Sequence, residues 1–300
     1  MTPKFQSSPP GISHPEKVFW PDEGYTKADL ANYYQQVFPL LKPYVDDRIL
    51  TLERCPDGLP GKCFYQKEKP KGMPPGTPTK KIANVTGKRS ATNYVLGGSL
   101  ATQLAMVNFG CIAIHATGSR AKTFPKPDWI CFDLDPASEK FADAAEAGKL
   151  VKEALDALKL VSFPKTSGSR GLHVFIPIRV GPSANDVLKF AEQFVQRLAA
   201  AHPEQLTVEH SIAARGQRVY LDPFRNGSVQ TVVTPYSVRH KPHAPVSTPL
   251  FWSEVKPSLD PASFNIGNFA LRRMKKKDPW ADFFQSRQAL TTAIKQMKQL

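Results

Sequence analysis

Hydrophobic positions recur along this chain in two patterns, one typical of amphipathic helices and one typical of short buried strands. Apolar residues at helical spacing predict a helix that begins after Thr26, a residue able to cap it, and ends near residue 41. Further helices are expected over residues 98–107, 140–160 and 185–201, and the last twenty residues also have a helical pattern.

Compact apolar runs between these helices predict strands. The runs occupy residues 49–52, 63–65, 111–114, 129–132, 172–176, 218–221 and 229–233. Helices and strands alternate loosely, and several strands follow one another as in hairpins, so the fold class is expected to be α/β or α+β.

The length of 300 residues fits a single domain. The pattern changes near Asp133, which allows two lobes around a cleft, an N-terminal lobe of about residues 1–110 and a catalytic lobe of about residues 111–300.

The polar segments are strongly basic. Residues 69–81 are rich in Pro, Gly and Lys and predict a basic loop, and residues 272–277 form a basic block that either touches a DNA backbone or is solvated. A formal net charge of +14 favours polyanionic partners, above all nucleic acid. No apolar run approaches the ~20 residues of a membrane span, and the N-terminus lacks a signal-peptide core. We therefore expect a cytoplasmic protein without membrane contact.

The chain has four cysteines, and no two of them form a C-x-x-C pair. A structural zinc is therefore not expected, and the spacing does not indicate a disulfide scaffold. Cys55, Cys63, Cys111 and Cys131 are expected to be buried free thiols.

Three acidic residues stand at the ends of predicted strands. Asp133 and Asp135 follow an apolar run, and side chains two apart in a strand point to the same face, roughly 6–7 Å apart. Asp222 precedes a proline and closes another strand. Solvated acids at a strand end explain either group alone, but three gathered carboxylates suit two Mg²⁺ or Mn²⁺ ions.

A basic turn rich in hydroxyl groups, at residues 165–173, leads into the predicted strand 172–176. Its glycines allow backbone N–H groups to approach an anion, and Ser167, Arg170 and His173 add donors. Alone, the turn fits an ordinary hairpin equally well. With the acids and with Arg215 and Arg239 nearby in sequence, it indicates nucleoside triphosphate chemistry.

These motifs resemble the polymerase/primase domain of bacterial DNA ligase D, a member of the archaeo-eukaryotic primase superfamily. The resemblance covers nearly the whole chain, with its motifs in the expected order. It rests on residues 12–17 (ISHPEK), 54–58 (RCPDG), 61–67 (GKCFYQK), 132–136 (FDLDP), 165–173 (KTSGSRGLH), 220–227 (YLDPFRNG), 235–239 (PYSVR) and 244–247 (APVS).

The resemblance implies a primase-like fold of mixed sheets flanked by helices around a central cleft. It also implies a stand-alone, nucleoid-associated bacterial polymerase that fills gaps and extends ends in non-homologous end joining. Such an enzyme uses two Mn²⁺ or Mg²⁺ ions, prefers ribonucleotides, and works with a Ku-like end binder and a separate DNA ligase.

The resemblance also implies roles for individual residues. Asp133, Asp135 and Asp222 would bind the metals, with Asp222 near the primer 3′-hydroxyl. The triphosphate would be held by Ser167, Arg170, His173, Arg215 and Arg239, and His115 would lie near the ribose 2′-hydroxyl.

Four residues would contact DNA by the same resemblance. Phe64 and Tyr65 would stack on a template base, although Phe64 also fits a core aromatic. Lys17 and Lys27 would bind the 5′-phosphate across a gap, although two solvated lysines are the plain alternative.

Two other functions remain open. A non-catalytic module that binds DNA ends and a 5′-phosphate would share the basic charge, but it would not need all three acids. A metal-dependent nuclease would use the same acids to cut DNA.

Overall fold

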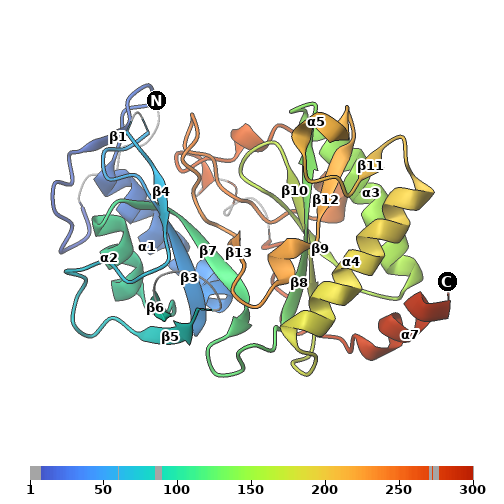
Figure 1. Ribbon diagram of the computed structural model, residues 1–300. Helices are drawn as coiled ribbons and strands as arrows, with labels where there is room; N and C mark the ends of the chain where they lie inside the picture. The colour runs from blue at the N-terminus through green and yellow to red at the C-terminus, as the bar shows by residue number, and fades with distance from the viewer. Residues whose placement is uncertain (1–7, 60, 85–89, 270–271, 273–276, 300) are drawn as a thin grey trace.

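The computed structural model describes residues 8–59, 61–84, 90–269, 272 and 277–299. Two main sheets stand side by side, and each carries helices on its outer face (Figure 1). Among the described residues, no helix combines the length and the apolar character needed to cross a membrane.

The first sheet has the strand order β13-β7-β3-β4, and its neighbouring strands are antiparallel. Its outer face packs against α1, where Thr26 caps the helix by accepting from the backbone of Asp29. The elements of this half are β1 (Val18–Trp20), β2 (Tyr25–Thr26), α1 (Lys27–Val45), β3 (Arg48–Arg54), β4 (Phe64–Gln66), β5 (Thr79–Ala83), β6 (Ala91–Val95), α2 (Leu100–Asn108), β7 (Cys111–Arg120) and β13 (Thr231–Val233).

The second sheet has the order β11-β12-β8-β10-β9, with β8 at its centre. Two long helices, α3 and α4, bury their apolar sides against it in a second hydrophobic core (Figure 1). Its elements are β8 (Trp129–Pro136), α3 (Phe141–Ala157), β9 (Phe163–Thr166), β10 (Leu172–Pro177), α4 (Ala184–Ala201), β11 (Leu206–Thr207), α5 (Ile212–Arg215), β12 (Val219–Asp222) and the 3₁₀ turns η1 (Phe224–Asn226), η2 (Trp252–Glu254) and η3 (Pro261–Ser263), with α7 (Thr291–Gln299) after them.

The mixed α/β class is confirmed, and two of the predicted elements need correction. The segment 79–81, expected to be loop, begins β5. Of the last twenty residues, helix α7 begins only at Thr291, and residues 281–290 are mostly turns. The rings of Trp280 and Phe283 stack at 4.9 Å in the first core, so these apolar positions are buried in turns and not on a helix face.

The sheets do not follow the expected boundary near residue 110. Both β7 and β13 come after that boundary in sequence, yet they pair within the first sheet, β7 with β3 and β13 with β7. The division into two lobes stays a prediction, and the chain crosses between the two sheets more than once.

The expectation of four free thiols was wrong for two of them. Cys55 and Cys63 form a disulfide, whereas Cys111 and Cys131 are free and buried. The reason lies in the hairpin register. Arg54 on β3 pairs with Phe64 on β4, so the next residues, Cys55 and Cys63, face each other where the connecting loop leaves and rejoins the two strands.

Candidate functional site

The three acids come together because their strands are neighbours in the second sheet. Asp133 and Asp135 lie two residues apart on β8, so their side chains share one face. On β12, Asp222 stands directly opposite Asp133 in the antiparallel register. The spacing along one strand and the pairing across two strands therefore gather three carboxylates at one point.

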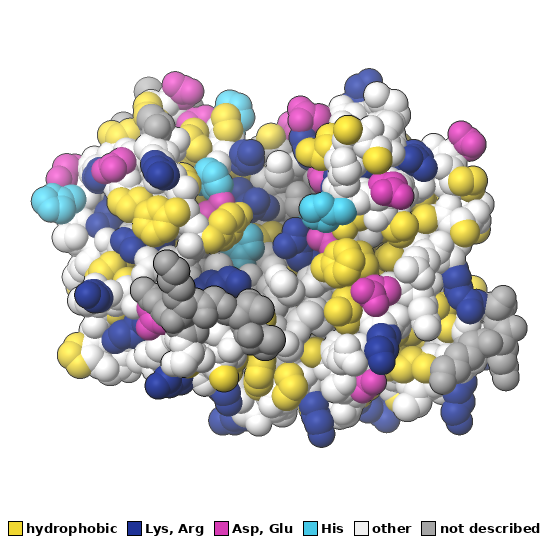
Figure 2. Space-filling view, viewed as in Figure 1, with side chains coloured by type: hydrophobic (Ala, Val, Ile, Leu, Met, Phe, Trp, Pro, Cys, Tyr) yellow, Lys and Arg dark blue, Asp and Glu magenta, His cyan; other side chains and the backbone are white. Residues whose placement is uncertain are grey.

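These acids line a cavity of about 720 Å³ between the two sheets. Figure 2 shows the hollow, with basic, acidic and histidine side chains gathered in it. Ten of the residues singled out from the sequence line it: Asp133, Asp135, Asp222, Ser167, Arg170, His173, Arg215, Arg239, His115 and Tyr65.

Arginines pair with each carboxylate. Arg225, in the turn after β12, reaches two acids at once, with Nε 3.3 Å from Asp133 Oδ2 and 3.1 Å from Asp222 Oδ2. Asp135 receives Arg170 Nε at 3.3 Å and Arg215 Nη1 at 3.0 Å. Arg225 was not among the site residues predicted from the sequence. Its signal was its position three residues after Asp222, which brings it back over the strand end.

The donor set fits hard divalent cations. Mg²⁺ and Mn²⁺ prefer carboxylate oxygens, and three such groups face one cavity. The guanidinium of Arg225 bridges Asp133 and Asp222, which shows that this pair already requires positive charge between its oxygens. Asp133, Asp135 and Asp222 are the residues that would hold the metal.

The two paired acids differ in their electrostatics. Burial acts to raise the pKa of Asp133, but His173 and Arg225 outweigh it and hold that pKa well below the usual range. Burial raises the pKa of Asp222, and the neighbouring Asp133 charge raises it further against the opposing effect of Arg225. A divalent ion at this point would relieve the repulsion between the two carboxylates.

A buried lysine stands behind His173. Lys165 Nζ lies 2.9 Å from His173 Nδ1 and 2.6 Å from Ser247 Oγ, and His173 Nε2 lies 3.2 Å from Asp133 Oδ1. Burial lowers the pKa of Lys165 to about 7, and burial together with the Lys165 charge lowers that of His173 to about 4. The basic turn was expected to bind anions, but the sequence did not reveal that its first residue is buried.

The turn from β9 to β10 forms a compact loop at the cavity wall. Ser167 Oγ accepts from the backbone N–H groups of Ser169 and Gly171, at 3.2 and 3.1 Å. Gly168 has a φ of +73°, and Arg239 Nη1 donates to Ser167 O at 2.7 Å. The loop and Arg239 thus form one hydrogen-bonded unit beside the acids.

His115 lies on the opposite wall, on β7. Its Nε2 is 3.4 Å from Glu53 Oε2, and its ring meets the Tyr65 ring edge-on at 5.4 Å. Glu53 is buried, and its second carboxylate oxygen lies 2.6 Å from His240 Nδ1. Burial acts to raise the pKa of Glu53, but His115, His240 and Arg239 hold it far below the usual range. Sequence analysis missed Glu53, because one acid in a strand carries no distinguishing signal.

Of the four residues expected to contact DNA, Tyr65 lines the cavity, and Phe64, Lys17 and Lys27 lie outside its lining. Phe64 and Tyr65 are 41% and 59% exposed, so Phe64 is not a core aromatic. Lys27 donates its backbone N–H to Lys17 O, which brings the two lysines together outside the cavity lining. Lys27 is only 5% exposed, with Nζ 2.8 Å from both Ser13 O and Asn108 Oδ1, so it is not a solvated lysine.

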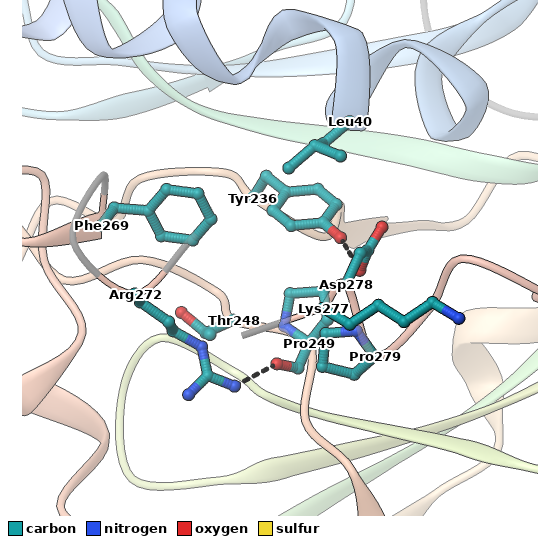
Figure 3. Close-up of a pocket in the computed structure, with 9 residues that line it drawn as sticks. All are labelled: Leu40, Tyr236, Thr248, Pro249, Phe269, Arg272, Lys277, Asp278 and Pro279. Carbon is teal, nitrogen blue, oxygen red and sulfur yellow. Dashed lines mark hydrogen bonds between the residues drawn. The ribbon is translucent and has the colours of Figure 1, made fainter. Parts of the chain in front are cut away.

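Two further features lie apart from the acids. A smaller pocket of about 270 Å³ shares no lining residue with the acidic cavity, and in it Tyr236 Oη donates to Asp278 (Figure 3). At its rim, Arg272 pairs with Glu254, whereas residues 273–276 of the predicted basic block lie outside the described part of the chain.

One ring nitrogen of His240 lies within 4.8 Å of both disulfide sulfurs, but bonded sulfurs offer no thiolate to a metal.

The fold and the site together define a domain of the primase-polymerase type. The sequence matches the LigD primase-polymerase domain over residues 26–280, and the chain belongs to this family. A solved structure described as the polymerase domain from Mycobacterium tuberculosis ligase D in complex with DNA superposes with a TM-score of 0.85. It is 26% identical, and the match covers 93% of this chain and 99% of that one.

Curated relatives have the same family name. The bifunctional non-homologous end joining protein LigD of Bacillus subtilis is 29% identical over 94% of this chain and 46% of its own length. The multifunctional LigD of Pseudomonas aeruginosa is 29% identical over 95% of this chain and 34% of its own length. The chain therefore spans about a third to a half of the relatives that it matches.

Proposed function

We propose that this protein is a DNA-dependent nucleotidyltransferase that fills gaps and extends ends during double-strand break repair by non-homologous end joining. The observation that carries the proposal is the register that places Asp222 opposite Asp133, with Asp135 beside them and a cluster of arginines, Ser167 and His173 around them. Phosphoryl transfer depends mainly on positioning and charge neutralisation, which such a cluster supplies.

In this proposal the reaction joins a primer 3′-hydroxyl to the α-phosphate of a nucleoside triphosphate and releases pyrophosphate. Asp133, Asp135 and Asp222 would hold two Mn²⁺ or Mg²⁺ ions, which would assist deprotonation of the hydroxyl and neutralise the phosphates. Asp222 lies nearest the primer terminus. Arg170 and Arg215, which pair with Asp135, would contact the triphosphate from the same side of the cavity.

The phosphates and the sugar are bound on opposite walls of the cavity. The triphosphate contacts Ser167, Arg170, His173, Arg215 and Arg239. Their donors converge from β10, its preceding turn, the end of α5 and the segment after β13. His115 lies near the ribose 2′-hydroxyl, which favours ribonucleotides as substrates.

DNA is bound along the exposed surface next to the cavity. Phe64 and Tyr65 project into solvent beside it and stack on a template base, a contact worth roughly 1–3 kcal/mol per base. Lys17 and Lys27 bind the 5′-phosphate across the gap. The solved relative is in complex with DNA, and the names of the relatives are those of end-joining proteins, which supports the end-joining role. A Ku-like end binder and a separate DNA ligase are the partners that this role would require.

A primer–template assay tests this function against its two rivals. With Mn²⁺ and each of four template bases, we expect the complementary nucleotide to be joined to the primer, ribonucleotides faster than deoxynucleotides. Binding of DNA without any incorporation would instead favour the non-catalytic end-binding module. Shortening of the labelled strand without nucleotide would favour a nuclease.

A further inference from the structure

Three side chains of the kind that bind metals gather where β4 begins. Cys55 follows the last residue of β3, Cys63 precedes the first residue of β4, and His240 lies in the segment after β13. One ring nitrogen of His240 lies within 4.8 Å of both sulfurs. None of the three residues lines the acidic cavity, so the cluster is separate from the lining of that cavity.

The backbone holds this cluster together independently of the disulfide bond. The pairing of Arg54 with Phe64 fixes β3 against β4 up to the two cysteines, whose Cα atoms are 4.3 Å apart. On the other side, Arg239 donates its backbone N–H to Pro245 O at 2.8 Å, which fixes the segment just before His240. Reduction of the disulfide therefore leaves two thiols and an imidazole side by side.

Two thiolates and an imidazole form a ligand set that suits zinc. Zn²⁺ binds cysteine sulfur at about 2.3 Å and histidine nitrogen at about 2.0 Å, whereas Mg²⁺ and Mn²⁺ prefer oxygen ligands. Glu53 Oε1 lies 2.6 Å from His240 Nδ1, and a carboxylate is a common neighbour of metal-binding histidines. The His240 side chain is 28% exposed, which gives an ion a path from solvent.

We propose that the reduced protein binds one Zn²⁺ ion through Cys55, Cys63 and His240, with water at the fourth position. First, a dithiol reductant gives two electrons and two protons to the disulfide, so the S–S bond breaks and the dithiol becomes a disulfide. Zn²⁺ then replaces the two thiol protons, which pass to solvent. Zinc was not expected from the sequence, because the ligands come from three segments and not from a C-x-x-C pair.

The disulfide and the zinc ion are alternative ties between the same strands. The ladder of β3 and β4 has three residue pairs, and Phe64 and Tyr65 lie at its end beside the cluster. A reduced chain without metal loses the tie, and Zn²⁺ restores it. Zn²⁺ should therefore raise the melting temperature of the reduced protein but not that of the oxidised protein.

Metal binding to the full chain tests the site directly. The protein is reduced with a phosphine, which becomes a phosphine oxide, then freed of metal with a chelator and kept without oxygen. Zn²⁺ is titrated against a chromophoric chelator, with excess Mg²⁺ present to occupy the carboxylates of the acidic cavity. We expect one Zn²⁺ per reduced chain with a dissociation constant on the order of 1 nM, and no such binding to the oxidised chain.

Cobalt identifies the kind of ligand. Co²⁺ in a tetrahedral thiolate site shows sulfur-to-metal charge transfer and intense visible bands, and we expect both in the reduced wild type, with loss of both when Zn²⁺ is added. The spectrum needs no variant, so it decides the question even where a cysteine variant fails to fold. Weak absorption without charge transfer would place the ion on oxygen ligands and overturn the proposal.

Matched variants assign the three ligands. Cys55→Ser, Cys63→Ser and His240→Gln should each weaken Zn²⁺ binding by at least about 100-fold, at or beyond the loss that removal of an outer-shell partner causes. The controls are His243→Gln, an exposed histidine three residues along, and Cys111→Ala, a buried free thiol, and both should bind Zn²⁺ as the wild type does. No tight binding by the reduced wild type, or equal binding by Cys63→Ser, would show that the cluster is not a zinc site.

Discussion

Arg225 occupies the position between two acids where positive charge is needed. Its Nε contacts both Asp133 and Asp222, and their charges raise the pKa of its guanidinium against the effect of burial. In Arg225→Gln the two carboxylates lose this counter-ion. We expect the melting temperature without metal to fall by several degrees, consistent with a loss on the order of 1–2 kcal/mol for a domain of this size.

Mn²⁺ should replace the lost charge. The variant should therefore gain more thermal stability from Mn²⁺ than the wild type does, as measured by differential scanning calorimetry. Arg218→Gln is the control, because the Arg218 guanidinium donates to the backbone carbonyls of Arg215 and Ala214 and lies outside the acidic cavity. A Mn²⁺ effect of equal size in all three proteins would show that the ion does not bind between these acids.

Lys165 gives the fold a dependence on pH. Its pKa is lowered to about 7 in the folded chain because it is fully buried, whereas an unfolded lysine titrates near 10.4. Between these values the unfolded chain binds a proton that the folded chain does not, so the free energy of unfolding rises with pH. The slope from this one group is at most about 1.4 kcal/mol per pH unit.

Urea unfolding at several pH values between about 7 and 10 measures this slope. Lys165→Met should lose the contribution, so the wild type gains stability relative to the variant as pH rises through this window. Lys189→Met, which removes an exposed lysine, should keep the wild-type slope. Parallel profiles for wild type and Lys165→Met would mean that Lys165 is not buried as a neutral amine.

At the scale of elements, the turn between β9 and β10 depends on a glycine. Gly168 has a φ of +73°, and a Cβ there would lie 2.6 Å from Arg239 Cγ and 3.0 Å from Ser247 N. Gly168→Ala should cost roughly 1–2 kcal/mol in backbone strain and displace Arg239 from Ser167. We expect nucleotide affinity, measured by isothermal titration calorimetry with Mn²⁺, to fall by about 10-fold. Gly181→Ala, where a Cβ would meet nothing within 4 Å, should leave affinity unchanged.

Elements with strong local signals were predictable from the sequence. Helix α1 begins after its cap at Thr26, and β8 and β12 were recognised from short apolar runs that end in acids. Since these strands are neighbours, the meeting of Asp133, Asp135 and Asp222 followed from the strand assignments and the family resemblance.

Features that depend on strand register or on packing between distant segments could not be predicted. The disulfide requires the register of β3 against β4, and Glu53 gains its importance only because β3 lies against β7. In the same way, the turns of residues 281–290 follow from burial of Trp280 and Phe283 in the first core, a contact invisible in local periodicity. The disulfide depends on a strand register, and the other two features depend on partners far away in the sequence.

At the scale of the whole molecule, one buried carboxylate ties three segments together. Asp128, just before β8, pairs with Arg48 of β3, with Arg120 of β7 at 3.0 Å and with Arg287 at 3.1 Å. The Arg48 guanidinium also lies 3.4 Å from the Trp129 ring centre. The cluster therefore links the first sheet, the second sheet and the C-terminal segment.

Replacing this carboxylate leaves the buried guanidinium of Arg48 without its counter-ion. Asp128→Asn should lower the free energy of unfolding by about 3–5 kcal/mol in urea denaturation. Asp156→Asn, which removes an exposed pairing with Lys152, should cost no more than about 0.5 kcal/mol. Similar losses in the two variants would mean that the Asp128 cluster does not join the sheets.

The central claim is that the trio of carboxylates transfers a nucleotide to DNA, and extension of a primer across a short gap tests it most directly. Wild-type protein, Asp222→Asn and the surface variant Glu153→Gln would each receive gapped duplex, Mn²⁺ and one complementary ribonucleotide, with a 5′-phosphate or a 5′-hydroxyl across the gap. We predict extension by wild type and Glu153→Gln that is stronger with the phosphate, and a loss of at least about 100-fold in Asp222→Asn. Undiminished extension by Asp222→Asn would contradict the account.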